Sequence, residues 1–167
     1  MLKKVLFPVV IGFVLAMLFV LSYFGQPGIN KFNVSVFNLG DIGLALREYV
    51  KKNDNTFPDK LEQLELYRTN PEKFESPLKP KKFNGPSYIY IAGHIPIDNK
   101  LEARKYIVAY ENPEYSSEYL SKENNHPFIA LFLNGTAARM KKDKFLESLE
   151  ETYKHLGKPM PEIQFKD

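Results

Sequence analysis

The sequence contains no cysteine and no tryptophan. The lack of cysteine excludes disulfide bonds, thiolate metal sites and a cysteine nucleophile within this chain. A phosphate-binding glycine loop, a Gly-x-Ser-x-Gly elbow and a His-Glu-x-x-His motif are missing as well, so no signature of nucleotide binding, serine hydrolysis or zinc proteolysis is present. We therefore predict that the protein is not an enzyme, and we assign no catalytic, cofactor-binding or metal-binding residues.

A strong excess of charge of either sign is also missing. The chain has 23 basic and 20 acidic residues. Lys3 and Lys4 are the only charged residues before position 25, which leaves 21 basic against 20 acidic residues in the remainder. This balance provides no broad basic surface, so we expect no nucleic-acid partner. The remainder, about 140 residues, has a size that suits one domain with its own core.

What the sequence does contain is a long apolar run near its start. Residues 5–24 are uncharged and predominantly apolar. A helix of roughly 20 such residues spans a hydrocarbon layer of about 30 Å, so we predict a transmembrane anchor with the lipid bilayer as its partner. The lysine pair just before the run favours a cytoplasmic N-terminus. The prediction is a single-pass membrane protein whose C-terminal domain is extracytoplasmic.

A cleaved signal peptide is the rival interpretation, because it also begins with basic residues followed by an apolar stretch. The apolar region of a signal peptide usually has only about 7 to 15 residues. The run here is longer, and the sequence that follows it from Leu21 to Pro27 lacks the small-x-small pattern of a cleavage site. These two features favour an uncleaved anchor.

The region after the anchor is predicted to contain a tether and then an amphipathic helix. Residues 25–37 begin with Gly-Gln-Pro-Gly, which favours a turn-rich tether. Asn38 is a plausible N-cap for the helix, which could also begin several residues earlier, and Asn-Asp-Asn at 53–55 should end it. We attribute Gly40 and Gly43 to close packing against another backbone. Apolar residues recur at helical spacing, namely Leu39, Ile42, Leu46, Tyr49 and Val50.

Two short helical segments and a lysine cluster are expected next. Asp59-Lys-Leu-Glu62 has the form of a capping box for a short helix that ends near Leu66. Asn70 before Pro71 is a second cap signal. Lys79, Lys81 and Lys82 lie in a proline-rich stretch. We interpret these lysines as a solvated loop, with contact to anionic lipid or an acidic partner as the alternative.

The second half of the chain is predicted to form an antiparallel sheet and a final helix. Segments 88–91 and 106–110 are rich in aromatic and branched residues, and segments 128–133 and 136–140 complete the predicted strands. Asn134-Gly135 between the last two favours a type I′ hairpin turn. An apolar stripe predicts a helix over 143–156, which Gly157 and Pro159 should end.

Alternation along the strands predicts which side chains share a face of this sheet. Tyr88 should lie on the same face as Tyr90, and Tyr106 on the same face as Tyr110. We expect the opposite face, with Ile89, Ile91, Ile107 and Ala109, to cover the first helix. The tyrosines would then form an outward, half-exposed face or a surface for a partner.

Titratable residues in the two long connections, about 94–104 and 112–127, are the remaining site candidates. His94, His126 and His155 lack metal-ligand spacing. Asp98 beside Asn99 has too little oxygen density to predict a calcium site. We interpret a set of four glutamates as solvated charges of the second connection, because sequence spacing does not show that any two of them converge: Glu111, Glu114, Glu118 and Glu123.

The order of these elements resembles the pseudopilins of type II secretion and related bacterial pilin-like proteins. The similar features are an N-terminal apolar helix, Ala-Leu-x-x-Tyr, Asp-Asn-x-x-Pro, Leu-x-x-Leu, and a strand that begins after a histidine and ends in a turn. They lie at Ala45, Leu46 and Tyr49; Asp54, Asn55 and Pro58; Leu61 and Leu64; His126 to Ala137; and Phe145. The resemblance implies a helix packed on a small antiparallel sheet and a role in a secretion or envelope machine, with other pilin-like or envelope proteins as partners.

Two features depart from that family. Family precursors are cut after a glycine and carry glutamate at the fifth mature position, whereas Gly12-Phe13 here lies inside the apolar run and its fifth position is Met17. No prepilin cleavage site is recognisable. Asn134 and Thr136 replace the aspartate and histidine that the family has around the turn.

Together these observations predict an α+β protein in which a transmembrane helix precedes a pilin-like domain with an amphipathic helix, an antiparallel sheet and a C-terminal helix. The predicted divisions are an anchor at 1–24, a tether at 25–37, a globular domain at 38–158 and a tail at 159–167. We predict a non-catalytic, membrane-anchored, pseudopilin-like accessory or scaffold protein. The alternative is an anchored extracytoplasmic binding or enzymatic domain that uses the loops around Asp98 and Glu118.

Overall fold

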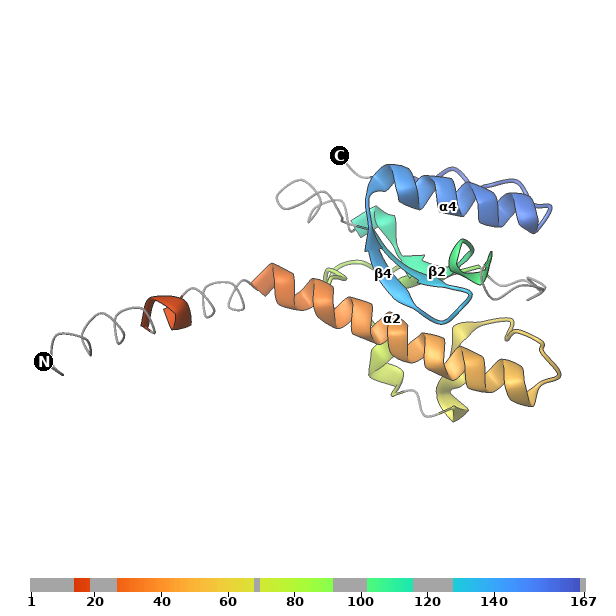
Figure 1. Ribbon diagram of the computed structural model, residues 1–167, viewed down its shortest axis with the longest axis horizontal. Coiled ribbons are helices and arrows are strands. Elements are labelled where there is room, and N and C mark those ends of the chain that lie inside the picture. The colour runs from red at the N-terminus through yellow and green to blue at the C-terminus, as the bar shows by residue number, and fades with distance from the viewer. Residues whose placement is uncertain (1–13, 19–26, 68–69, 92–101, 116–127, 166–167) are drawn as a thin grey trace, which may run out of the picture.

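The chain is an α+β protein with a four-stranded antiparallel sheet (Figure 1). The computed structural model describes residues 14–18, 27–67, 70–91, 102–115 and 128–165. Most of the predicted anchor therefore lies outside the described residues. Its only described part is the helical segment 14–18. Within the described ranges, no helix combines the length and the apolar character that crossing a bilayer requires.

The sheet is a meander in which neighbours in sequence are neighbours in space. Its strands are β1 (Tyr88–Tyr90), β2 (Ile107–Glu111), β3 (Phe128–Phe132) and β4 (Ala137–Met140), in the order β1-β2-β3-β4. Ile89 pairs with Tyr110, and Ala130 pairs with Ala138. The four predicted strands are confirmed.

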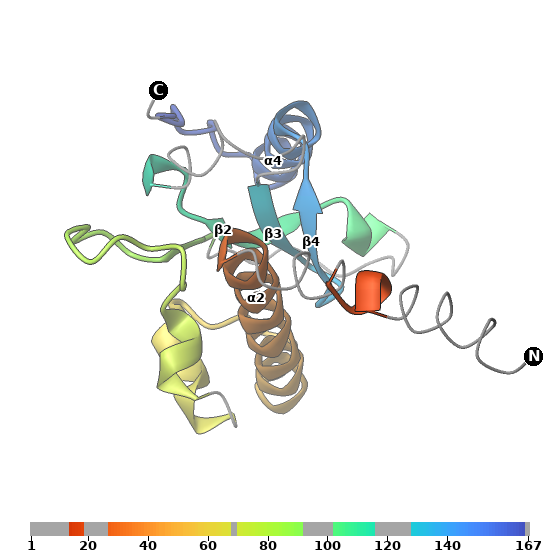
Figure 2. The ribbon, with the colours of Figure 1, turned by 90° about the vertical axis from the view of Figure 1, so that its left-hand side faces the viewer.

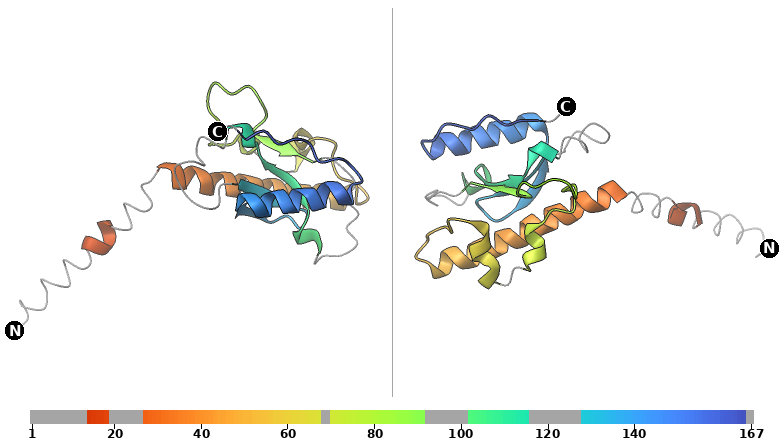
Figure 3. Two further views of the ribbon diagram at one scale, coloured as in Figure 1. Left: turned by 90° about the horizontal axis from the view of Figure 1, so that it is seen from above. Right: turned by 180° about the vertical axis from the view of Figure 1, so that it is seen from behind.

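A helix covers each face of this sheet, which makes three layers. The long helix α2 (Pro27–Lys52) packs on one face and α4 (Lys142–His155) on the other (Figures 1 and 3). The side chains between α2 and the sheet include Leu39, Ile42 and Ile129. Those between the sheet and α4 include Phe128, Phe145 and Leu149. Because both faces are covered, every residue of β2 and β3 is buried.

The prediction of an outward tyrosine face is wrong. Tyr88 and Tyr90 do share a face, but that face packs toward α2. Ile89, Ile91 and Ile107 pack toward α4 instead. Only Ala109 of the four residues expected beneath the first helix lies there. The hydroxyl groups explain how tyrosine is accommodated beside the core: for example, the OH of Tyr90 donates to the C=O of Pro58 at 2.9 Å.

A β-bulge separates Tyr106 from Tyr110. The pairing of β2 with β3 shifts register between Ile107 and Ala109, so Val108 and Ala109 both join the α2-side core. Tyr106 packs with that same core, whereas Tyr110 lies on the α4 side with its ring 5.3 Å from the ring of Phe145. Simple alternation fails at this position because a bulge inserts one extra residue into the strand.

The β3–β4 turn differs from the predicted type I′ turn. Gly135 has a φ of +82°, whereas Asn134 keeps a negative φ. The N–H of Gly135 donates to the C=O of Phe132 at 2.8 Å, which makes a three-residue loop with a glycine bulge. The N–H groups of Leu133 and Asn134 donate to the residues before β2, at Tyr106 and Ala103. A type I′ turn would require a positive φ at Asn134 as well as at Gly135, and Asn134 does not have one.

Helix α2 begins earlier than predicted. It starts at Pro27, so residues 27–37 of the expected tether are helical and Asn38 is not its N-cap. Phe32 and Ser35 in this first part are buried, which shows that tertiary packing outweighs the turn preference of the local sequence. The predicted end is confirmed: α2 stops at Lys52, and Asp54 and Asn55 adopt φ values of +50° and +59°.

Gly43 lets α2 approach the β3–β4 turn closely. A Cβ at this position would lie 2.6 Å from the carbonyl oxygen of Gly135 and 2.7 Å from the Leu131 Cδ1. The prediction of close backbone packing is therefore confirmed for Gly43. It is wrong for Gly40, where a Cβ would meet no atom within 4 Å.

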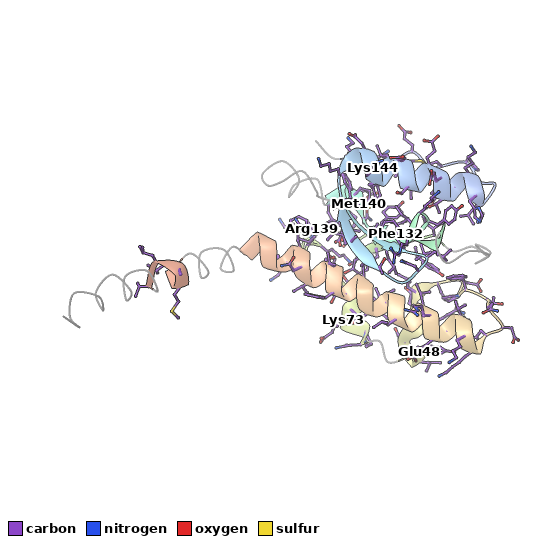
Figure 4. The ribbon with its side chains drawn as sticks, in the orientation of Figure 1. Glu48, Lys73, Phe132, Arg139, Met140 and Lys144 are labelled. Carbon is purple, nitrogen blue, oxygen red and sulfur yellow. The ribbon has the colours of Figure 1, made fainter. Side chains whose placement is uncertain are left out.

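Two short 3₁₀-helices follow α2 and pack against it. The first, η1 (Leu61–Leu66), is preceded by Lys60, and Gln63 rather than Glu62 provides the capping acceptor, taking the N–H of Asp59 at 2.7 Å. The second, η2 (Pro71–Phe74), has the predicted cap, because the Asn70 side chain accepts the N–H of Glu72 at 3.1 Å. Figure 4 shows Lys73 of η2 beside α2, where its Nζ is 3.1 Å from an oxygen of Asp41.

The predicted C-terminal helix is confirmed at α4. Gly157 has a φ of +63°, and its N–H donates to the C=O of Lys154 at 3.1 Å. The N–H of Lys158 donates to the C=O of Tyr153 at 3.0 Å. These two bonds form a Schellman motif, which satisfies carbonyl groups that the helix end leaves without partners.

Candidate functional site

Most of the residues singled out in the two long connections lie outside the described residues: His94, Asp98, Asn99, Glu118, Glu123 and His126. The alternative function that uses the loops at Asp98 and Glu118 therefore stays a prediction. His155 is exposed at the end of α4, with its ring stacked 4.4 Å from the Tyr106 ring. In the described part of the chain, no three histidine, aspartate or glutamate residues lie together in a way that could hold a metal ion.

Glu111 is the residue for which the sequence interpretation is most clearly wrong. We predicted a solvated loop charge, but Glu111 is the last residue of β2 and is only 2 % exposed. Glu114, three residues later, is exposed as expected. The β2 strand extends one residue beyond its apolar segment, and this extension carries the Glu111 carboxyl group into the layer between β1, β2 and α2.

Hydroxyl groups from four parts of the chain surround this carboxyl group. Ser35 of α2 donates to Oε2 of Glu111, and the OH of Tyr115 lies 2.5 Å from Oε1. The Oγ of Ser35 is also 3.2 Å from the OH of Tyr88 on β1 and 3.4 Å from the Oγ of Ser76. We call these five residues the Glu111 cluster. Because its members come from α2, the loop after η2, β1, the end of β2 and the helical turn 113–115 that follows, the cluster ties the helix to the sheet.

Burial raises the pKa of Glu111 above its ordinary value, although the hydrogen bonds from Ser35, Ser76 and Tyr115 act in the opposite direction. No cation among the described residues pairs with the carboxyl group. Burial raises the pKa of Tyr88 and Tyr115 as well, and the nearby Glu111 charge adds to both shifts. These hydroxyl groups therefore remain protonated donors, which suits a structural network that satisfies a buried acid.

One signal in the sequence points to this cluster. Ser35 lies four residues before Leu39 and seven before Ile42, so it falls on the inward stripe of α2. A polar side chain at an inward position needs a hydrogen-bond partner. The partner, however, is 76 residues away in sequence, and only the folded chain identifies it as Glu111.

Part of α2 presents apolar side chains outward. Val34, Phe37 and Leu44 are 39 %, 68 % and 59 % exposed, and their spacings of three and seven residues place them on one side of the helix. We call them the outer stripe. In the helical segment 14–18, the apolar side chains are also exposed: Val14, Leu15, Met17 and Leu18.

A groove of about 520 Å³ lies between the C-terminal half of α2, the loop that follows it and the β3–β4 turn. Two basic side chains, Arg47 and Lys51, line it together with Asn55. Figure 4 marks Phe132, which belongs to the apolar part of the lining. That apolar part consists of Leu46, Val50, Phe57, Phe132 and Leu133. The volume of the groove is in the range of known ligand sites. Glu111 does not line the groove.

Comparison of this chain with models of known protein families, with curated proteins and with solved structures found no match.

Proposed function

We propose that the protein is a membrane-anchored, pseudopilin-like accessory or scaffold component of a bacterial secretion or envelope system, and that it is not catalytic. Its N-terminal run would hold it in the bilayer, and the α+β domain would project from the outer side. The support is the order of elements: an apolar segment, a long helix packed on an antiparallel meander, and sequence motifs that resemble those of pilin-like proteins.

The observation that carries this proposal is the outer stripe of α2. A helix that served only to cover the sheet would bury its apolar residues on one side and carry polar residues on the other. In α2 the inward apolar residues are buried as expected. The helix also carries exposed apolar residues in the outer stripe, of which Phe37 is 68 % exposed. A second apolar side on a long helix supports packing against another helix, as a scaffold component requires.

The Glu111 cluster supports the non-catalytic part of the proposal. A general acid or base must come within hydrogen-bond reach of a substrate. Glu111 is 2 % exposed, and both of its carboxylate oxygens contact hydroxyl groups of the chain itself. Its arrangement supports a role in holding α2 on the sheet.

Isolation of the tagged full-length protein from its native cells in mild detergent tests the proposal. We expect the protein in a complex larger than the monomer, as measured by native mass spectrometry. Phe37→Ser should remove the partners, because it deletes the most exposed side chain of the outer stripe. The control Glu150→Ser, at an exposed position of α4, should retain them. Recovery of the wild-type protein only as an isolated monomer would contradict the proposal.

A further inference from the structure

The groove beside α2 combines an apolar lining with two cations. The side chain of Arg47 lies against the β3–β4 turn at the groove, since a Cβ on Gly135 would lie 2.7 Å from the Arg47 Cδ. Among the described residues, no ion pair or hydrogen bond engages the charged group of Arg47 or Lys51, and no acidic residue lines the groove. An occupant that complements this groove has an apolar group with carboxylates beside it.

The same chain presents a group of that kind at η1. Leu66 is 91 % exposed, the highest value among its large apolar side chains in the described ranges. Glu62 and Glu65 are also exposed, and their spacing of three aligns them along one side of a 3₁₀-helix. Leu61 and Leu64 are buried and fix η1 against the core. We call Glu62, Glu65 and Leu66 the η1 knob.

The knob and the groove are separated by α2. Figure 2 shows the η1–η2 segment on one side of α2 and the β3–β4 turn on the other. A knob therefore does not occupy the groove of its own chain. A chain that places its knob in a neighbour's groove keeps its own groove free for a third chain.

We propose that a second copy of this chain docks its η1 knob in the α2 groove, with Leu66 against the apolar lining and Glu62 and Glu65 toward Arg47 and Lys51. Knob and groove are different surfaces, so the contact is heterologous and joins copies head to tail. The inference rests on the proposed scaffold function, because it names the contact through which copies associate.

Cysteine cross-linking of the full-length protein in detergent tests this geometry, and the absence of native cysteine leaves only the introduced thiols to react. Leu66→Cys and Lys51→Cys are prepared as separate proteins, mixed in equal amounts and oxidised. We expect disulfide-linked dimers in the mixture at roughly tenfold the yield of either protein alone. A single protein that carries both Leu66→Cys and Lys51→Cys should form a ladder of higher multimers, because each copy can then be linked at its knob and at its groove. Glu150→Cys mixed with Leu66→Cys is the matched control and should give no more dimer than Leu66→Cys alone.

A charge exchange tests the specificity of the contact. Adding Glu62→Lys and Glu65→Lys to the Leu66→Cys protein should lower the yield of cross-linking to the Lys51→Cys protein about tenfold, because the two new lysines then face the partner's Arg47. Adding Arg47→Glu to the Lys51→Cys protein should restore the yield with that charge-reversed knob. Circular dichroism establishes that each variant is folded.

Three results would overturn this contact: no dimer in the mixture, equal dimer yields from Leu66→Cys alone, or no restoration by Arg47→Glu in folded variants. If one of them occurs while Phe37→Ser still removes partners from the native complex, the scaffold proposal stands and only this contact is wrong. If head-to-tail dimers form but native complexes are not found, the scaffold proposal fails by itself.

Discussion

At the scale of single residues, Glu111 is the most unusual feature of the domain. A buried carboxyl group without a cation is costly to a folded protein unless hydrogen bonds satisfy it. Here the hydroxyl groups of Ser35 and Tyr115 contact both oxygens. These hydrogen bonds offset part of the cost of burying the Glu111 carboxyl group, a cost that a hydrophobic residue would not have. They also connect α2 to two strands at a defined position.

Replacement of Glu111 by Gln should lower the free energy of unfolding by about 1–3 kcal/mol, because the amide nitrogen replaces one of the two oxygens that contact the hydroxyl groups of Ser35 and Tyr115. Chemical unfolding of the full-length protein in detergent, followed by circular dichroism, measures the loss. The control Glu114→Gln changes an exposed residue and should shift the unfolding free energy by less than about 0.5 kcal/mol. Equal losses in both variants would contradict a special role for Glu111.

The pH dependence of stability should also follow from Glu111. Its pKa is raised in the folded state, so the folded chain retains the proton where the unfolded chain has lost it. The stabilisation is present below the ordinary pKa of 4.5 and is lost as the pH rises above it, by at most about 1.4 kcal/mol per pH unit. The deficit of Glu111→Gln relative to wild type should therefore be smaller at about pH 8 than at about pH 5. A larger stability deficit at about pH 8 than at about pH 5 would contradict a pKa of Glu111 that is raised in the folded state.

At the scale of elements, the position of α2 depends on its closest contact with the hairpin. Gly43 and Gly40 differ by less than one turn of the same helix, yet only Gly43 faces the β3–β4 turn. The two glycines therefore allow a matched comparison between a packing requirement and simple helix propensity.

Gly43→Ala should destabilise the domain by about 1–3 kcal/mol, because the new methyl group would overlap with the carbonyl of Gly135 and the side chain of Leu131. Gly40→Ala should stabilise it by up to about 1 kcal/mol, since its Cβ enters open space and alanine favours the helix. Thermal unfolding of both variants checks the opposite signs. Stabilisation by both substitutions would mean that α2 does not approach the turn this closely.

Helix α4 is the element that completes the second core. The Phe145 ring stacks on the Phe128 ring with their centroids 4.8 Å apart, and it meets the Tyr110 ring edge-on. Phe145→Ala should cost about 3–5 kcal/mol. The exposed control Glu147→Ala should cost less than about 0.5 kcal/mol. Near-ultraviolet circular dichroism of the tyrosines reports the loss, and an unchanged unfolding midpoint for Phe145→Ala would contradict the packing of α4 on the sheet.

At the scale of the whole molecule, the domain has a covered sheet and an uncovered helix side. The central strands β2 and β3 are buried beneath α2 on one face and α4 on the other, so these two strands offer no free face to a partner. The outer stripe of α2 and the groove remain accessible. A partner is therefore expected to approach along α2.

The membrane placement of the full chain is tested by fractionation. We expect the wild-type protein to stay with membranes in high salt and in alkaline carbonate, and to dissolve only in detergent. Replacing Val14 and Leu18 by Lys should release it, because each charge in the middle of a spanning helix costs about 2.5–3.5 kcal/mol. The control replaces the exposed Lys81 and Lys82 by Ser and should remain bound. Release of the wild-type protein by salt alone would rule out the anchor.

The local sequence determined the strands, α4 and the C-terminal ends of α2 and α4, because these depend on periodicity and on side chains that act within a few residues. Gly157 ends α4 and Asn70 begins η2 through contacts with their nearest neighbours in the chain. Only the tertiary structure decided the early start of α2, the bulge in β2, the turn geometry at Gly135 and the burial of Glu111. Each of these depends on a partner far away in sequence, as Ser35 does on Glu111, and no local pattern contains the identity of such a partner.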